Sequence, residues 1–181
     1  MKLLVCISKV PDTTSKINFV DNNTKFDENG VQYIVNPYDE WYALVRALEL
    51  VEAQGGSVTT ITVGTSSDDP TIRKALAIGA NDAVRIDADP SDPHFVAKQI
   101  AEYAKNENYD IILTGKETIN YNGSQIGGMI AEMLNTPFVS LATKLDVTNN
   151  VATLERDVKG GVEVVEVITP FVLSAAKGMA E

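Results

Sequence analysis

The sequence DIILTGKETINYNGSQIGGMIAEML, residues 110–134, contains the pattern that decides the fold. Its apolar run at residues 111–113 is typical of a buried strand in a parallel sheet. Residues 126–134 carry apolar side chains at helical spacing. Between the strand and the helix lies a polar loop, and the segment holds four glycines, Gly115, Gly123, Gly127 and Gly128. This order predicts an anion site, because backbone N–H groups and the positive end of a helix dipole meet at such a loop; glycines that only form turns are the alternative.

The rest of the first 134 residues also alternates between strand and helix patterns. Apolar or β-branched runs predict strands at residues 2–8, 58–64 and 83–86, and short alternating pieces predict a hairpin at residues 16–20 and 24–26. Helix starts are predicted at Asn36, Asp69 and Asp92. In the first helix we expect Asn36 to be the N-cap and Pro37 the first helical residue. The alternation predicts an α/β fold with a doubly wound, mostly parallel sheet and helices on both faces, Rossmann-like and suited to an adenine nucleotide.

The pattern changes after Pro137. Strand-like segments follow one another and are joined by turn residues, at residues 145–147, 151–158, 162–168 and 169–175. We therefore expect one nucleotide-binding α/β domain over residues 1–181, with residues 141–170 as an appended antiparallel β-ribbon. Valines in the ribbon offer more apolar surface than a monomer normally exposes, which favours a partner protein; packing on the chain's own sheet is the alternative.

Composition excludes several classes of function. The net charge is −10, from 15 Lys+Arg against 25 Asp+Glu, which disfavours binding to nucleic acid. The single cysteine excludes an internal disulfide and fits a reducing compartment, so we expect a cytoplasmic protein. The N-terminal apolar run is too short for a signal peptide, and no apolar stretch reaches the roughly 18 residues that span a bilayer, so we expect no membrane insertion.

Patterns that would indicate an enzyme are missing from the sequence. Gly115-Lys116 lacks the upstream glycine of a phosphate-binding loop, and the first strand runs into Ser8-Lys9-Val10-Pro11 rather than a glycine-rich dinucleotide fingerprint. One histidine and one cysteine leave no His-based triad and no structural zinc site. Carboxylate pairs fall at predicted helix starts, where helix-end electrostatics explains them. We expect no catalytic residues and no metal site.

A binding site made largely of backbone remains. In a doubly wound sheet the ligand lies at the carboxyl ends of the strands, where strand order reverses. The segments predicted at that edge are residues 6–9, 63–66, 115–125 and the helix start at 36–39. Main-chain groups there could hold adenine, and the N–H groups of residues 123–126 could hold phosphate, with Lys116 as the one nearby cation.

Two motifs resemble the electron transfer flavoprotein β subunit. Asn-Pro-Tyr-Asp-Glu at residues 36–40 is similar to the start of a helix in that family. Gly-Lys-Glu-Thr-Ile-Asn at residues 115–120, continued through residues 125–127, looks like its nucleotide loop. Residues 73–80 and 156–161 also fit the family pattern, so the resemblance covers essentially the whole chain in order.

The resemblance implies a noncatalytic subunit of a heterodimer. The partner α subunit would carry most of the FAD site, and this chain would bind AMP in a structural role. The dimer would take electrons from acyl-CoA-type dehydrogenases of fatty acid oxidation and pass them to a membrane-associated quinone oxidoreductase. The implied AMP contacts are Cys6, Asn36, Pro37, Tyr38, Asp39, Val63, Gly115, Lys116, Glu117, Thr118, Ile119, Asn120, Tyr121, Asn122, Gly123, Ser124, Gln125 and Ile126.

Two departures from the family pattern leave alternatives open. Residues 120–124 read Asn-Tyr-Asn-Gly-Ser where many relatives have an acidic run, and electron-bifurcating members bind a second FAD here in place of AMP. The chain also ends at Glu181, whereas family members continue into a dehydrogenase-docking loop and an arm around the α subunit, so the sequence looks C-terminally truncated. A homodimeric, stress-protein-like module that binds ATP is a second candidate, and a nucleotide-directed enzyme is a third.

Overall fold

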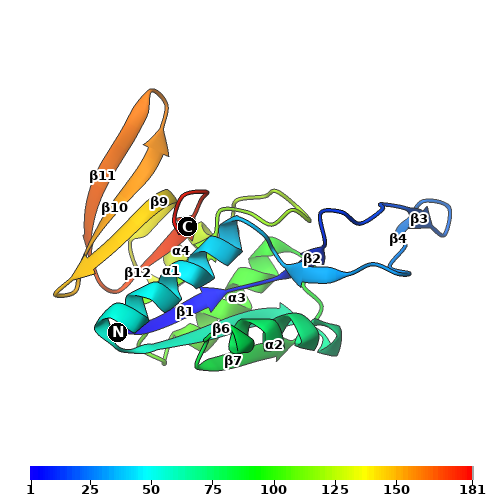
Figure 1. Cartoon of the computed structure of the whole chain (residues 1–181), viewed down its shortest axis with the longest axis horizontal. Coiled ribbons are helices and arrows are strands. Elements are labelled where there is room, and N and C mark those ends of the chain that lie inside the picture. Colours follow the sequence, from blue (N-terminus) through cyan, green and yellow to red (C-terminus); the bar gives the residue numbers. More distant parts are fainter. Residues whose placement is uncertain (181) are drawn as a thin grey trace.

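An eight-stranded sheet forms the centre of the chain, of which the computed structural model describes residues 1–180 (Figure 1). The strand order is β11-β10-β9-β12-β8-β1-β6-β7. The strands are β1 (Lys2–Cys6), β6 (Ser57–Gly64), β7 (Asp82–Asp87), β8 (Ile111–Gly115), β9 (Phe138–Thr148), β10 (Val151–Val158), β11 (Gly161–Ile168) and β12 (Phe171–Ala175). All neighbours from β9 through β7 pair in parallel, and β10 pairs antiparallel with both β9 and β11. This confirms the predicted α/β fold with a mostly parallel sheet.

Helices cover both faces of the sheet. Helices α1 (Asp39–Gln54) and α2 (Asp69–Ala77) pack on one face, and α3 (Pro93–Ala104) and α4 (Ile126–Leu134) pack on the other (Figure 1). Strand β1 is central, and its side chains alternate between the two cores: Leu3 and Val5 face α1, whereas Leu4 and Cys6 face α3 and α4. Burial on both faces explains why this strand is an unbroken apolar run.

Two small sheets lie outside the main one. Strand β2 (Lys9–Pro11) pairs with β5 (Tyr33–Val35), and β3 (Phe19–Val20) pairs with β4 (Lys25–Phe26) in the predicted hairpin. Asn22 and Asn23 in its turn have φ values of 56° and 65°, a left-handed conformation that asparagine tolerates. This hairpin and the β10–β11 ribbon project from opposite ends of the molecule (Figure 1).

The predicted start of the first helix is wrong by two residues. Helix α1 begins at Asp39, with Tyr38 rather than Asn36 as the N-cap and with no side-chain cap hydrogen bond. Pro37 therefore precedes the helix instead of forming its first residue. The reason is that the Asn36 side chain is engaged elsewhere, in two hydrogen bonds to residues 117 and 119.

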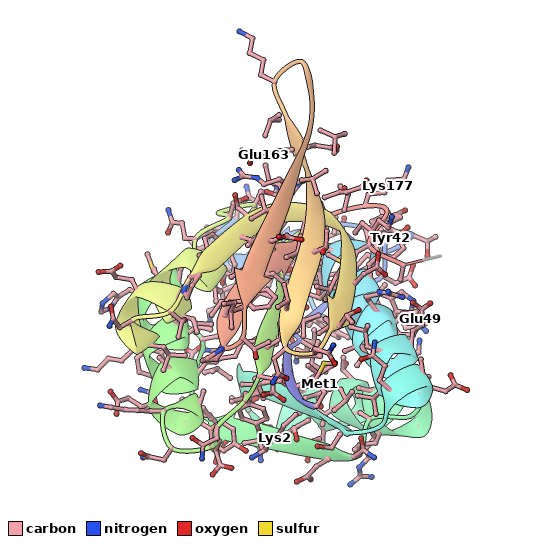
Figure 2. All side chains as sticks on the ribbon, turned by 90° about the vertical axis from the view of Figure 1, so that its left-hand side faces the viewer. Met1, Lys2, Tyr42, Glu49, Glu163 and Lys177 are labelled. Carbon is pink, nitrogen blue, oxygen red and sulfur yellow. The ribbon has the colours of Figure 1, made fainter. Side chains whose placement is uncertain are left out.

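The β10–β11 ribbon, together with β9, continues the main sheet. Strand β9 pairs with β12 along one edge and with β10 along the other. On the α1 side, β9 contributes Leu145 and Val147 to the core, and β10 contributes Ala152 and Leu154. Val162, Val164 and Ile168 of the edge strand β11 are exposed. Figure 2 shows the ribbon rising past the helices, with Glu163 labelled beyond them. Internal packing and an exposed apolar surface therefore both occur in the ribbon.

Candidate functional site

A cavity of about 460 Å³ lies at the carboxyl ends of β1, β6 and β8. Strand β1 lies between β8 on one side and β6 and β7 on the other, so the chain changes direction across the sheet at this point. Ligands of doubly wound sheets bind at such a switch in strand order. The volume is within the range of small-molecule sites. The cavity is therefore the candidate binding site.

The structure brings most of the predicted site residues to this cavity. Those that line it are Cys6, Val63, Gly115, Lys116, Glu117, Thr118, Asn120, Tyr121, Gly123, Ser124, Gln125 and Ile126. Those that do not are Asn36, Pro37, Tyr38, Asp39, Ile119 and Asn122. The start of α1 and the loop after β8 nevertheless lie at the same rim, because Asn36 is hydrogen-bonded to that loop.

The start of α4 supplies the feature expected of an anion site. No side chain caps α4, whose N-cap residue is Gln125. The cavity lining includes both Gln125 and Ile126, so the positive end of the helix dipole opens onto the cavity. Gly123 adds space, since no heavy atom lies within 4 Å of a Cβ placed there.

The other glycines of the motif make room for the protein itself. A Cβ on Gly115 would lie 2.7 Å from Cγ and 2.9 Å from the backbone nitrogen of Glu40. A Cβ on Gly127 would lie 2.7 Å from Thr114 Oγ1 and 2.9 Å from the Phe138 ring. Gly115 thus lets α1 approach β8, and Gly127 lets α4 approach the sheet.

Glu40 is a buried carboxyl group in the cavity wall. It accepts hydrogen bonds from the backbone nitrogen of Ser8 at 2.6 Å and from Ser8 Oγ at 2.9 Å. Burial raises the pKa of Glu40 to about 8, although the bonds from Ser8 act in the opposite direction. Sequence reasoning explained this residue by the helix dipole alone and missed its bond to the end of β1.

Lysines in the cavity are engaged by protein groups. Lys116 Nζ lies 3.0 Å from Glu117 Oε1. The hydrogen bond between these side chains raises the pKa of Lys116. Lys9 also lines the cavity, so the expectation that Lys116 is the one nearby cation is wrong. Lys9 Nζ donates to Ser67 Oγ at 2.7 Å and lies 3.9 Å from Asp68, whose pKa burial raises. Neither lysine offers an unpaired charge to a ligand.

Several parts of the lining lie outside the predicted segments, including side chains around β2, β4 and β5 (Pro11, Phe26, Glu28 and Tyr33) and two on α3 (Val96 and Ile100). Three more that bear on the chemistry are Glu40, Asp68 and residues 89–93, the last of which follow β7. The rule that ligands lie at the carboxyl ends of strands could have included residues 89–93, because β7 is parallel to β6. Asp68 belongs to a short 3₁₀ helix, η1 (Ser66–Asp68), for which the sequence shows no distinctive pattern.

Reactive groups are few at this site. Burial, and secondarily the charge of Glu40, raises the pKa of the Cys6 thiol well above its usual range, which disfavours the nucleophilic thiolate. Within residues 1–180, no cluster of three or more His, Cys, Asp or Glu side chains is arranged to hold a metal ion. No helix in that part of the chain has the length and apolar character needed to cross a membrane.

Comparisons with known proteins agree with this architecture. Residues 23–181 match the model of the electron transfer flavoprotein domain. The electron transfer flavoprotein subunit beta of Bacillus subtilis is 35% identical, in an alignment that covers 100% of this chain and 71% of the relative. The mitochondrial subunit beta of Oryza sativa subsp. indica is 36% identical over 96% of this chain and 71% of the relative. Protein FixA of Sinorhizobium fredii is 31% identical over 98% of this chain and 66% of the relative. The chain belongs to the electron transfer flavoprotein β-subunit family.

Proposed function

We propose that this chain is the β subunit of a heterodimeric electron transfer flavoprotein and that it holds AMP in the cavity at the switch point. The observation that carries the proposal is the uncapped start of α4 facing that cavity, in a chain of this family. The α subunit carries most of the FAD site. The dimer takes electrons from acyl-CoA-type dehydrogenases and passes them to a quinone oxidoreductase, and this chain supplies no catalytic group.

The residues at the cavity fit AMP. Backbone N–H groups of residues 123–126 hold the phosphate, aided by the α4 dipole and the open space at Gly123. The apolar part of the cavity, which includes Cys6, Val63 and Ile126, takes the base. AMP has no redox chemistry here, so its contribution is to fill and order the site.

Charge in the cavity favours AMP over ATP. Six carboxylic acids line it, Glu28, Glu40, Asp68, Asp89, Asp92 and Glu117, of which Glu40 keeps its proton below about pH 8. The lysines of the cavity, Lys9 and Lys116, both lie beside carboxylates. Additional phosphates would therefore meet repulsion without a free cation among the described lining residues to offset it. This weighs most against the ATP-binding homodimer and less against FAD, which has two phosphates rather than three; FAD, as in bifurcating members, is the alternative to AMP.

Acid extraction of the purified chain followed by chromatography tests the ligand. We expect AMP; ATP would support the homodimeric module, and FAD would support a bifurcating subunit. Calorimetric titration of the nucleotide-free chain with AMP and with adenosine provides the control, because adenosine has the same base and ribose but lacks the phosphate. We expect adenosine to bind about 100-fold more weakly than AMP, which corresponds to losing one or two charge-assisted hydrogen bonds. Equal affinities would contradict a phosphate site at α4.

The β10–β11 ribbon is the surface we propose for the α subunit. Val162, Val164 and Ile168 on β11 are 56%, 65% and 69% exposed, and β11 has an unpaired edge within the described residues. Such a surface is unusual on a monomer and is prone to pair with another chain.

A charged residue on this surface should weaken assembly. We expect Val164→Lys to reduce complex formation with an electron transfer flavoprotein α subunit by at least about tenfold, as desolvating a lysine would require. Size-exclusion chromatography of the mixed subunits measures the complex. Val20→Lys, on the β3–β4 hairpin, is the matched control. A wild-type chain that stays a stable, nucleotide-free monomer and does not bind the α subunit would contradict this proposal.

A further inference from the structure

Asn36 occupies an unusual place beside the site. Asn36 is 1% exposed, and it is not among the residues that line the cavity. Its side-chain Nδ2 donates to the carbonyl oxygen of Glu117 at 2.9 Å, and its Oδ1 accepts from the backbone nitrogen of Ile119 at 3.1 Å. Both ends of the carboxamide are therefore used on one loop, more than 80 residues away in the chain.

Asn36 is itself fixed to the scaffold. Its backbone nitrogen donates to the carbonyl oxygen of Ser8 at 3.0 Å, and its carbonyl oxygen accepts from the backbone nitrogen of Trp41 at 3.2 Å. The residue thus joins the end of β1 to the first turn of α1. A side chain held in this way can fix the position of whatever it binds.

The loop depends on such a contact. Its tip is exposed, with Tyr121 at 69%, and Asn122 and Ser124 have positive φ values of 48° and 52°. Several of its hydrogen bonds are internal, such as those from Tyr121 and Asn122 to the Thr118 carbonyl oxygen. Asn120 Nδ2 adds an exposed bond to the Lys9 carbonyl oxygen at 3.2 Å. The two hydrogen bonds that the Asn36 side chain makes with the loop are better shielded from water and therefore constrain the loop more strongly.

We propose that Asn36 is a positioning residue, whose carboxamide latches residues 117–119 so that the loop presents the backbone N–H groups of residues 123–126 to a ligand. The ligand part of this inference rests on the proposed function, whereas the latch concerns the chain alone. The site needs one donor and one acceptor on a short side chain, and a carboxamide provides both.

Asn36→Asp gives the sharpest test because its effect should depend on pH. The ionised carboxylate of this variant keeps the acceptor for Ile119 but places a second acceptor against the Glu117 carbonyl oxygen. The neighbouring charged groups are Asp39 and Glu40 on α1 and Lys116 and Glu117 in the loop. Burial and the nearby carboxylates of Asp39 and Glu117 raise the pKa of the introduced carboxyl group, while Lys116 lowers it. Protonation restores a donor and hence the latch.

Hydrogen exchange of the ligand-free chain measures the latch directly. At pH 8 we expect the Ile119 amide of Asn36→Asp to exchange about tenfold faster than in the wild type, as loss of one hydrogen bond implies. At about pH 5.5 the ratio should return toward one. Asn36→Leu should lose protection at both pH values. Asn106→Asp, which adds the same charge at an exposed position, should match the wild type at both.

AMP titration of the same proteins separates the latch from the ligand. We expect AMP to bind Asn36→Asp about tenfold more weakly at pH 8 and to regain affinity at about pH 5.5. Wild-type protection of Ile119 in Asn36→Asp at pH 8, or recovery of Asn36→Leu at low pH, would overturn the latch. A latch seen by exchange in a chain that never binds AMP would overturn the proposed function instead. Unchanged AMP affinity despite a released loop would overturn the positioning role.

Discussion

Gly115→Val is expected to destabilise the chain by about 3 kcal/mol and to weaken AMP binding by roughly 100-fold. A Cβ at this position would lie 2.7 Å from Cγ and 2.9 Å from the backbone nitrogen of Glu40, and 3.1 Å from Asp39 Cβ. Because one of these atoms is backbone, a side-chain rotation cannot relieve the contact. The first turn of α1 must move away from β8, and the rim of the cavity moves with it.

Urea denaturation and calorimetric titration with AMP measure the two effects. Gly161→Val is the matched control, since no heavy atom lies within 4 Å of a Cβ at Gly161. Gly115→Ala adds the same Cβ, and so the same contact with Glu40, but less bulk. It replaces the valine variant in both measurements if that variant does not fold. Wild-type stability and AMP affinity in both Gly115 variants would mean that α1 can shift at little cost. The close approach of α1 to β8 would then be unimportant for stability and for AMP binding.

Stability that falls as pH rises is the second large effect we expect, and it comes from Glu40. Burial raises the pKa of Glu40 from 4.5 to about 8 in the folded chain. Between these values the folded state keeps the proton that the unfolded state has released. The folded state therefore binds more protons, and the free energy of unfolding decreases with rising pH by about 1 kcal/mol per pH unit in this window. Above about pH 8 the contribution of Glu40 stops changing.

Glu40→Gln should remove this slope. Glutamine keeps an acceptor for the backbone nitrogen of Ser8 and adds a donor for Ser8 Oγ, so the contact survives without a charge. We expect the variant to match the wild type near pH 5 and to exceed its stability by several kcal/mol near pH 8. Urea denaturation across the window, with exposed Glu132→Gln as control, provides the measurement. Identical slopes for wild type and Glu40→Gln would mean that Glu40 is ionised in the folded chain throughout.

The general architecture was predictable because its signals are local. Strand β8 and helix α4 follow directly from apolar spacing around residues 111–134, and parallel pairing follows from the alternation of strands with helices. The position of β12 was not predictable. Its sequence indicates a strand, but insertion between β8 and β9 depends on contacts about 60 residues away in the chain.

The candidate site was predictable where backbone topology decides it and not where side-chain pairing does. The rule for strand ends placed Cys6, Val63 and the loop after β8 at one cavity. The roles of Asn36 and Glu40 depend on partners at residues 117, 119 and 8, which no local pattern reveals. Helix-end preferences predict only a capping role for Asn36 and a helix-dipole role for Glu40, whereas in the structure each side chain bonds a segment distant in the chain.

Strand β12 also has a consequence for how the protein is made. It separates β8 from β9, and its Ala175 carbonyl oxygen accepts from the backbone nitrogen of Lys116 at the start of the loop after β8. During translation, β1, β6, β7 and β8 leave the ribosome well before β12 does. We therefore expect the edge of β8 to stay unpaired in the nascent chain, and the cavity wall after β8 to be completed only when the segment around residue 175 has emerged.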